Sequence, residues 1–216
     1  MPSVKIPKKS TDVDMTPFVD VAFLILTFFI MATKFKPPEP VPVITPKSVS
    51  TKELPEDNAV LITIDKGGQV YFTALSDKKQ SILIDLAGYV SSLKTLGLTD
   101  AEKANFKKTP LMGIPFSQLK QFLDYPIEQQ KGIKQPGIPM DTTGGELTYW
   151  ISAARSAFQG TALLYLIKGD NDSKYPVFKN VIEALKKNDV YKYNLITAPE
   201  DAPPNTELYK ERHKAT

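Results

Sequence analysis

The stretch DMTPFVDVAFLILTFFIMATK, residues 14–34, decides how this chain is organised. Its middle, residues 15–33, contains a single charged side chain, that of Asp20. A helix of this length measures roughly 28 Å at a rise of 1.5 Å per residue, about the thickness of the hydrocarbon core of a bilayer. The stretch therefore predicts one transmembrane helix over residues 15–33, and it raises the question of why a carboxyl group lies inside it.

Asp20 shares one side of the predicted helix with two hydroxyl groups. At 100° per residue, Thr16 lies one turn below Asp20 and Thr27 lies two turns above it. Thr16 followed by Pro17 also suits the N-cap and the first helical position, because proline has no N–H group to leave unpaired there. The opposite side is apolar and is formed by Phe18, Ala22, Ile25 and Phe29.

An unpaired carboxylate at the centre of a bilayer costs about 2.5–3.5 kcal/mol, which a simple anchor has no reason to bear. The polar stripe of Thr16, Asp20 and Thr27 therefore indicates a surface that faces other helices or a thin water path. There the carboxyl group can pair, or it can take up and release a proton. In an alternative that the sequence leaves open, Asp20 stays protonated and makes only a packing hydrogen bond.

Two other interpretations fit the stretch less well. A cleaved signal peptide would explain the lysines before it and the small residues Ala32 and Thr33. However, the apolar region of a signal peptide gains nothing from Asp20, and Met31 is too bulky for the cleavage site. A buried helix of a globular domain is the second alternative, but the aromatic and aliphatic residues leave no broad polar side for water.

The residues DMTPFVDVAFLILTFF resemble the transmembrane signature of the ExbD/TolR family, the small subunits of bacterial ion-driven energy-transducing complexes. In that family a T-P-x-x-D pattern opens the only membrane helix, and the membrane aspartate belongs to the proton pathway. The resemblance places that aspartate on Asp20 and the Thr-Pro pair on Thr16 and Pro17.

After the helix comes KPPEPVPVITPKSVSTKELPEDN, which has six prolines between Pro37 and Pro55. Because proline breaks helices and central strands, residues 34–58 are predicted to be an extended spacer. The spacer is interpreted either as an ordinary domain linker or as a tether that lets the following domain meet a partner away from the membrane.

The pattern of residues 59–198 predicts a small α+β domain with the order β-β-α-β-α-β. AVLITI and QVYFT flank DKGG, whose glycines allow a tight reversal, so a hairpin is expected. Apolar residues then recur at helical spacing twice, each time before a β-rich run. The elements are strands at 59–64 and 69–73, a helix through Leu147, Trp150, Ile151, Ala154 and Phe158, a strand in 161–168, a helix behind Pro176 through Phe178, Val181, Ile182 and Leu185, and a strand in 191–197.

The same family has a soluble domain that this region resembles, in VLITIDKGGQVYF and in YLIKGDNDSKYPVFKNVIEALKKNDVYKYNLIT. The chain departs from compact members over residues 74–145. That insertion contains an evident helix in KKQSILIDLAGYVSSLKTL, then DAEKANF, PFSQLKQFL and a loop rich in Gly and Pro. We expect it to cover part of the domain, so no partner-binding residue is carried over from the soluble domain of the family.

Composition and motifs exclude several kinds of chemistry. The chain has no cysteine and one histidine, His213, in a polar tail, so disulfides, thiolate metal sites and a Ser-His-Asp triad are not expected. Asp170 and Asp172 are oxygen ligands of the kind found in calcium loops, but no glutamate follows at EF-hand spacing, and a strand-to-helix turn explains them better. The net charge of +3 comes without a nucleic-acid signature. We therefore expect neither an enzyme nor a cofactor or metal site.

The resemblance implies a non-enzymatic subunit of a proton-motive-force-driven motor in the inner membrane, which energises TonB-dependent outer-membrane transport. It implies an ExbB/TolQ-like polytopic channel subunit, a TonB-like periplasmic protein and a second copy of this chain as partners. Lysines flank both ends of the helix, so only the resemblance places residues 1–14 in the cytoplasm, and the spacer 34–58, residues 59–198 and the tail 199–216 in the periplasm. The alternatives are a TolR-like role in envelope maintenance and a signal-anchored periplasmic binding module.

Overall fold

A computed structural model describes residues 15–32, 41–48, 57–76, 80–109, 111–141 and 144–199. The chain forms two units, Met1–Glu39 and Pro40–Thr216. In the first unit, helix α1 spans Thr16–Ala32 and buries none of its residues. A helix was predicted there, and it is confirmed. Among the described residues, however, no helix combines the length and hydropathy required to cross a membrane, so the transmembrane assignment of residues 15–33 is not confirmed.

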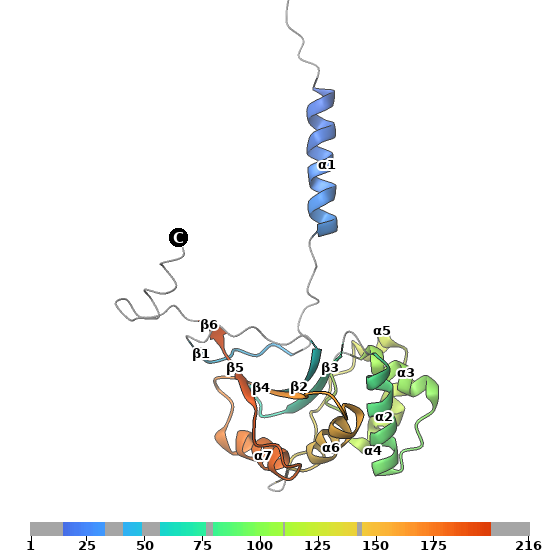
Figure 1. The fold of residues 1–216 in the computed structure, drawn as a ribbon, viewed down its shortest axis with the longest axis vertical. Helices are drawn as coiled ribbons and strands as arrows, with labels where there is room; N and C mark the ends of the chain where they lie inside the picture. The colour runs from blue at the N-terminus through green and yellow to red at the C-terminus, as the bar shows by residue number, and fades with distance from the viewer. Residues whose placement is uncertain are drawn as a thin grey trace, which may run out of the picture. The chain divides into compact units, whose positions relative to one another are not determined.

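The second unit is built on a four-stranded sheet in the order β3-β2-β4-β5 (Figure 1). Strands β2 and β3 are antiparallel, whereas β2 pairs with β4 and β4 pairs with β5 in parallel. The predicted β-β-α-β-α-β order is confirmed. The strands are β2 (Asp57–Ile64), β3 (Val70–Ser76), β4 (Leu164–Gly169) and β5 (Asn194–Ile196), the last shorter than the predicted run of residues 191–197.

The hairpin turns where the DKGG sequence predicts it. Gly68 has a φ of 80°, a left-handed conformation that glycine adopts without strain. The Asp65 carbonyl accepts a hydrogen bond from Gly68 N–H at 3.0 Å, and the Asp65 carboxylate accepts one from Gln69 N–H at 2.7 Å. Local hydrogen bonds and one glycine therefore fix the register of β2 against β3.

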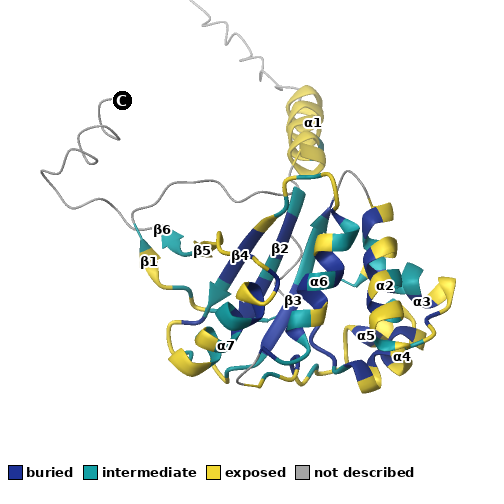
Figure 2. Ribbon diagram, turned by 60° about the horizontal axis from the view of Figure 1, so that its bottom comes forward, coloured by how far each residue is buried: buried dark blue, intermediate teal, exposed yellow. Residues whose placement is uncertain are grey.

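Helices α6 (Leu147–Ala157) and α7 (Tyr175–Lys186) pack on one face of the sheet, as predicted. Alternate residues of β2, namely Val60, Ile62 and Ile64, belong to the same buried core as Trp150 and Ile151 of α6. Figure 2 shows the buried residues concentrated on the central strands and on α6. The alternation of strand residues and the helical spacing thus meet in one core.

The described part of the insertion between β3 and α6 contains four helices, α2 (Ser81–Lys94), α3 (Asp100–Lys108), α4 (Phe116–Asp124) and α5 (Ile127–Gln130). Helix α3 begins with a capping box, in which Thr99 and Glu102 each bond the other's backbone N–H. The helices gather on one side of the sheet, where α2 packs against α6 (Figure 1). The expectation that the insertion covers part of the domain is confirmed.

An aromatic stack joins the insertion to the sheet. The ring of Trp150 in α6 stacks on Phe72 of β3 at 5.3 Å between ring centroids, on Phe116 of α4 at 5.3 Å, and on Phe106 of α3 at 5.8 Å. Trp150 is fully buried. Aromatic pairs at these distances contribute beyond their buried area, so one side chain of α6 holds three segments together.

The insertion also covers the outer edge of β3. Phe72 N–H donates to the Met112 carbonyl at 2.7 Å, and Met112 N–H donates to the Phe72 carbonyl at 2.8 Å. Further along, Ile138 N–H donates to the Val70 carbonyl at 2.7 Å. Backbone groups that an exposed edge strand would offer to other chains are thereby used within the domain.

Part of the predicted spacer is bound to the domain. Strand β1 (Lys47–Ser48) pairs in parallel with β6 (Ala198–Pro199), at the start of the predicted tail. The segment is extended, as predicted, but residues 41–48 lie in the same unit as the domain. Prolines that exclude a helix or a central strand are compatible with a short strand at an edge, which explains the difference.

We predict that Phe106→Ala destabilises the domain by about 3–5 kcal/mol, because it removes one wall of the Trp150 stack and leaves a cavity. The chain has one tryptophan, so the fluorescence of Trp150 during denaturant unfolding of the full chain in detergent measures the domain alone. Tyr191→Ala is the matched control, since that ring is 70% exposed. Equal stabilities of the two variants would contradict the role assigned to the stack.

Candidate functional site

The three polar residues predicted to share a side of the membrane helix all lie on α1. At 100° per residue, Thr16, Asp20 and Thr27 fall within an arc of about 40°, and no residue of α1 is buried. The Thr27 hydroxyl donates to the Leu24 carbonyl of its own helix at 2.9 Å. The Thr27 hydroxyl therefore already has an acceptor within its own helix. The Asp20 side chain is exposed, so it is accessible to a partner outside the helix.

The remainder of α1 is an exposed apolar surface. Eleven of its large hydrophobic side chains are exposed, each by half or more of its area. They are Phe18, Val19, Val21, Phe23, Leu24, Ile25, Leu26, Phe28, Phe29, Ile30 and Met31. An exposed apolar surface of this extent marks a site of association with a membrane or with other proteins. The predicted apolar wall opposite Asp20 is part of it.

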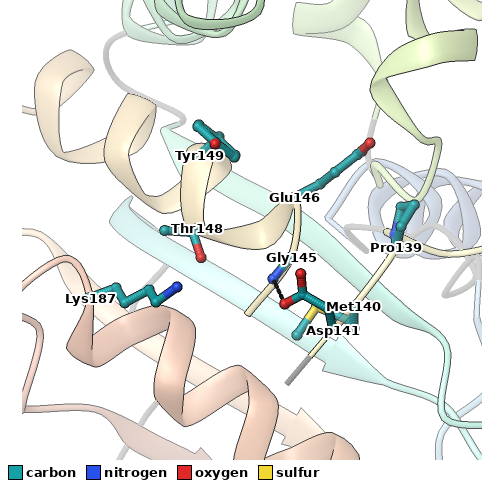
Figure 3. Close-up of a pocket in the computed structure, with 8 residues that line it drawn as sticks. All are labelled: Pro139, Met140, Asp141, Gly145, Glu146, Thr148, Tyr149 and Lys187. Atoms are coloured by element: carbon teal, nitrogen blue, oxygen red, sulfur yellow. Dashed lines mark hydrogen bonds between the residues drawn. The ribbon is translucent and has the colours of Figure 1, made fainter. Parts of the chain in front are cut away.

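In the domain, a second candidate site is an open pocket of about 370 Å³ between the end of the insertion, the start of α6 and the end of α7 (Figure 3). Its lining residues are Pro139, Met140, Asp141, Gly145, Glu146, Thr148, Tyr149 and Lys187. Lys187 extends toward the pocket from the end of α7, and the Asp141 carboxylate accepts a hydrogen bond from Gly145 N–H at 2.7 Å (Figure 3).

Two of the pocket's residues, Glu146 and Tyr149, make contacts that hold the insertion to α6. Glu146 points away from Lys187 (Figure 3). Its carboxylate accepts a hydrogen bond from Phe116 N–H at 2.8 Å. Glu146 thus caps α4 from the start of α6. The ammonium group of Lys94 lies 3.3 Å from the centroid of the Tyr149 ring, a cation–π contact at the pocket rim. The pocket thus lies where the insertion meets α6.

Burial raises the pKa of the Glu146 carboxyl group, while the hydrogen bond from Phe116 and the charge of Lys94 act in the opposite direction. The sequence analysis did not identify this residue. Its only signal is an acidic residue directly before a helix, and the partner lies 30 residues away in the chain.

The turn interpretation of Asp170 and Asp172 is confirmed. The Asp170 carboxylate accepts a hydrogen bond from Asp172 N–H at 2.9 Å, and Asp172 pairs with Lys66 at 2.8 Å. Within the described ranges, no group of three or more His, Cys, Asp or Glu side chains could hold a metal ion. His213 lies outside the described residues.

Comparison with known proteins identifies relatives. The family model described as biopolymer transport protein ExbD/TolR matches residues 7–200. A biopolymer transport protein ExbD from Mannheimia haemolytica is 26% identical over 112 residues, which cover 45% of this chain and 77% of that protein. No solved structure matches. The family match spans α1, the insertion and the whole sheet.

We predict that Glu146 makes the domain less stable as the pH rises. A carboxyl group whose pKa is raised by folding binds its proton more tightly in the folded state, so its contribution declines as the pH rises from the unfolded pKa through the folded one. Relative to Glu146→Gln, which keeps the acceptor oxygen, the wild type should lose free energy of unfolding as the pH rises above about 4, the ordinary pKa of a glutamate. Trp150 fluorescence measures the unfolding.

Glu128→Gln is the control for this prediction, because Glu128 is an exposed carboxyl group in the same insertion. A difference between wild type and Glu146→Gln that stays constant with pH, or grows in favour of the wild type, would show that burial of Glu146 has no such effect.

Proposed function

The chain belongs to the ExbD/TolR family of biopolymer transport proteins, and on that premise we propose that it is the proton-coupled, non-enzymatic subunit of an inner-membrane motor. The family supports a motor-associated transport subunit. The proposal adds that α1 lies in the membrane and that Asp20 takes part in proton translocation. The observation that supports it best is the single charge of Asp20 within an otherwise uncharged apolar helix.

The apolar surface of α1 supports a place in the membrane. Its 17 residues correspond to roughly 26 Å at 1.5 Å per residue, at the short end of the range for a spanning helix. Met15 and Thr33 extend the uncharged flanks of this helix in the sequence. Lipid tails would remove the exposed aromatic and aliphatic side chains from water without any partner of complementary shape.

Asp20 gives such a helix two preferred environments. Protonated, the carboxyl group is neutral and tolerates an apolar surface; ionised, it favours an aqueous path. One elementary charge that crosses 100 mV provides about 2.3 kcal/mol, so each proton transfer can bias the orientation of the helix. The hydroxyl groups of Thr16 and Thr27 lie on the same side of the helix as Asp20, and that of Thr27 bonds the Leu24 carbonyl of its own helix.

A single helix cannot enclose a proton path, so the proposal requires partners. We infer a polytopic ExbB/TolQ-like channel subunit around α1 and a second copy of this chain. The soluble domain would then pass motion to a TonB-like periplasmic protein and so to outer-membrane transporters. This places residues 1–14 in the cytoplasm and the domain in the periplasm, in an inner-membrane protein.

We predict that Asp20→Asn abolishes proton flux and outer-membrane uptake, because asparagine keeps the size and hydrogen bonding of the side chain but cannot ionise. Flux is measured in proteoliposomes that contain the chain and its copurified channel subunit, and uptake in cells that express the variant at the normal level. Thr27→Val is the control, since that hydroxyl already bonds Leu24 of its own helix, and it should retain most of the flux.

Full flux and uptake in Asp20→Asn would leave α1 as an anchor only, and the chain would then be a membrane-anchored binding module. The same cells show which process the motor drives. Failure to grow on scarce iron or cobalamin indicates TonB-dependent uptake, whereas sensitivity to detergent indicates a TolR-like role in envelope maintenance.

We further predict that the domain is labelled from the periplasm. The chain contains no cysteine, so a single Tyr191→Cys provides one reactive thiol on a side chain that is 70% exposed. A membrane-impermeant maleimide should modify it in cells whose outer membrane alone is permeabilised. A cysteine in place of Ser3 is the opposite control, and labelling of Ser3→Cys but not Tyr191→Cys would reverse the proposed orientation.

A further inference from the structure

Residues 44–48 of the spacer, here called the strap, are hydrogen-bonded to the domain. Ile44 N–H donates to the Asp170 carboxylate at 2.9 Å, and the Ile44 carbonyl accepts from Asn171 N–H at 2.8 Å. Two residues on, the Pro46 carbonyl accepts from Ala198 N–H at 2.8 Å, where β1 begins to pair with β6. The strap therefore lies along the ends of β4 and β5.

The domain side of this contact is fixed by the sheet. Asp170 directly follows β4 and is 7% exposed. Its own N–H donates to the Ile64 carbonyl at 2.9 Å, and its carbonyl accepts from Ser173 N–H at 3.0 Å. The hydrogen bonds from Asp172 N–H and then Ile44 N–H lower the pKa of the Asp170 carboxyl group. The acceptor for the strap is therefore ionised and held in place at neutral pH.

The strap side of the contact is suited to release. The Ile44 side chain is 77% exposed, so the strap is held by hydrogen bonds and not by burial of that side chain. Net stabilisation by hydrogen bonds is modest because water replaces them when they break. Pro42 and Pro46 restrict the free segment to extended conformations, so it loses less entropy when it binds again.

We propose that the strap is a releasable contact that sets the length of chain between α1 and the domain. The hydrogen bond from Ile44 N–H to the Asp170 carboxylate holds it in the bound position. When the strap is bound, residues 33–43 connect Ala32 to Ile44, a reach of at most about 40 Å. When it is released, the connection runs to Asp57 at the start of β2, a reach of about 85 Å. This length change holds whether or not Asp20 carries protons.

Ile44→Pro tests the strap without altering the domain, because proline has no N–H to donate to Asp170. Hydrogen exchange is measured on the full chain in lipid nanodiscs, at the amides of Asn171 and Ala198, which donate to the strap. We expect both amides to exchange about tenfold faster in Ile44→Pro, in line with the loss of a hydrogen bond to a charged group. The amides within β4 should be unchanged.

Val43→Pro is the matched control, because it introduces proline one residue earlier and keeps Ile44 N–H. A second control, Asp172→Asn, removes the charge that pairs with Lys66 and should leave the strap bound. The proposal is overturned if the wild-type amides of Asn171 and Ala198 exchange as fast as in an unstructured peptide. It is also overturned if Ile44→Pro leaves them as protected as Val43→Pro does.

Spin labels on Ala32→Cys and Lys174→Cys measure the reach directly, since the chain has no other thiol. Ile44→Pro should add long distances that are absent in the wild-type distribution, and Val43→Pro should not. Identical distributions in the two variants would show that the strap does not limit the reach. Neither readout depends on proton flux, so the fate of the strap proposal is separate from that of the motor proposal.

Discussion

The stacking of Trp150 is the constraint on which the architecture of the domain depends. Its ring contacts Phe72 of the sheet and Phe106 and Phe116 of the insertion, so α6 cannot keep its place on the sheet while the insertion moves independently. The hydrogen bond from Phe116 to Glu146 reinforces the same junction, because one residue of α4 both stacks on α6 and is capped by it. The insertion is thus part of the core and not an appendage to a compact domain.

Because the insertion is fixed in this way, it changes which edges the sheet presents. Met112 and Ile138 bond the backbone of β3, so the β3 edge is covered, whereas at the other edge the short strand β5 carries an exposed Leu195. Strand edges are where extended partners add to a sheet. A partner that adds an extended segment to this sheet would therefore use the β5 edge. The strap already occupies the ends of β4 and β5, and a partner that binds there has to displace it.

Periodic signals made much of this fold predictable. The hairpin, α6 and α7 each show an alternation or a helical spacing that a core requires, and Asp20 was identifiable as the one charge in an apolar run. The strap could not be predicted in this way. Its partners lie about 130–150 residues away in the sequence, and backbone pairing leaves no pattern of side chains to read. The sequence analysis did not identify Glu146 for the same reason, because its partner is a backbone N–H group of another helix. Asp170 and Asp172 were correctly assigned to a turn, but only the structure showed that Asp170 also binds Ile44.

The free energy that proton transfer would supply and the free energy that holds the strap are of the same order, so one process could drive the other. A proton that crosses 100 mV provides about 2.3 kcal/mol, and a backbone hydrogen bond contributes about 0.5–1.5 kcal/mol net. The bond from Ile44 N–H to the charged Asp170 carboxylate adds about 1.5–3 kcal/mol to the two backbone bonds at the carbonyls of Ile44 and Pro46. Together they resist release by an amount that about one to three protons could supply. A strap buried through large apolar side chains would exceed that supply, and a strap without hydrogen bonds would not hold at all. An exposed Ile44 bound through its backbone lies between these limits, as a contact that a proton-driven helix could break and the domain could make again.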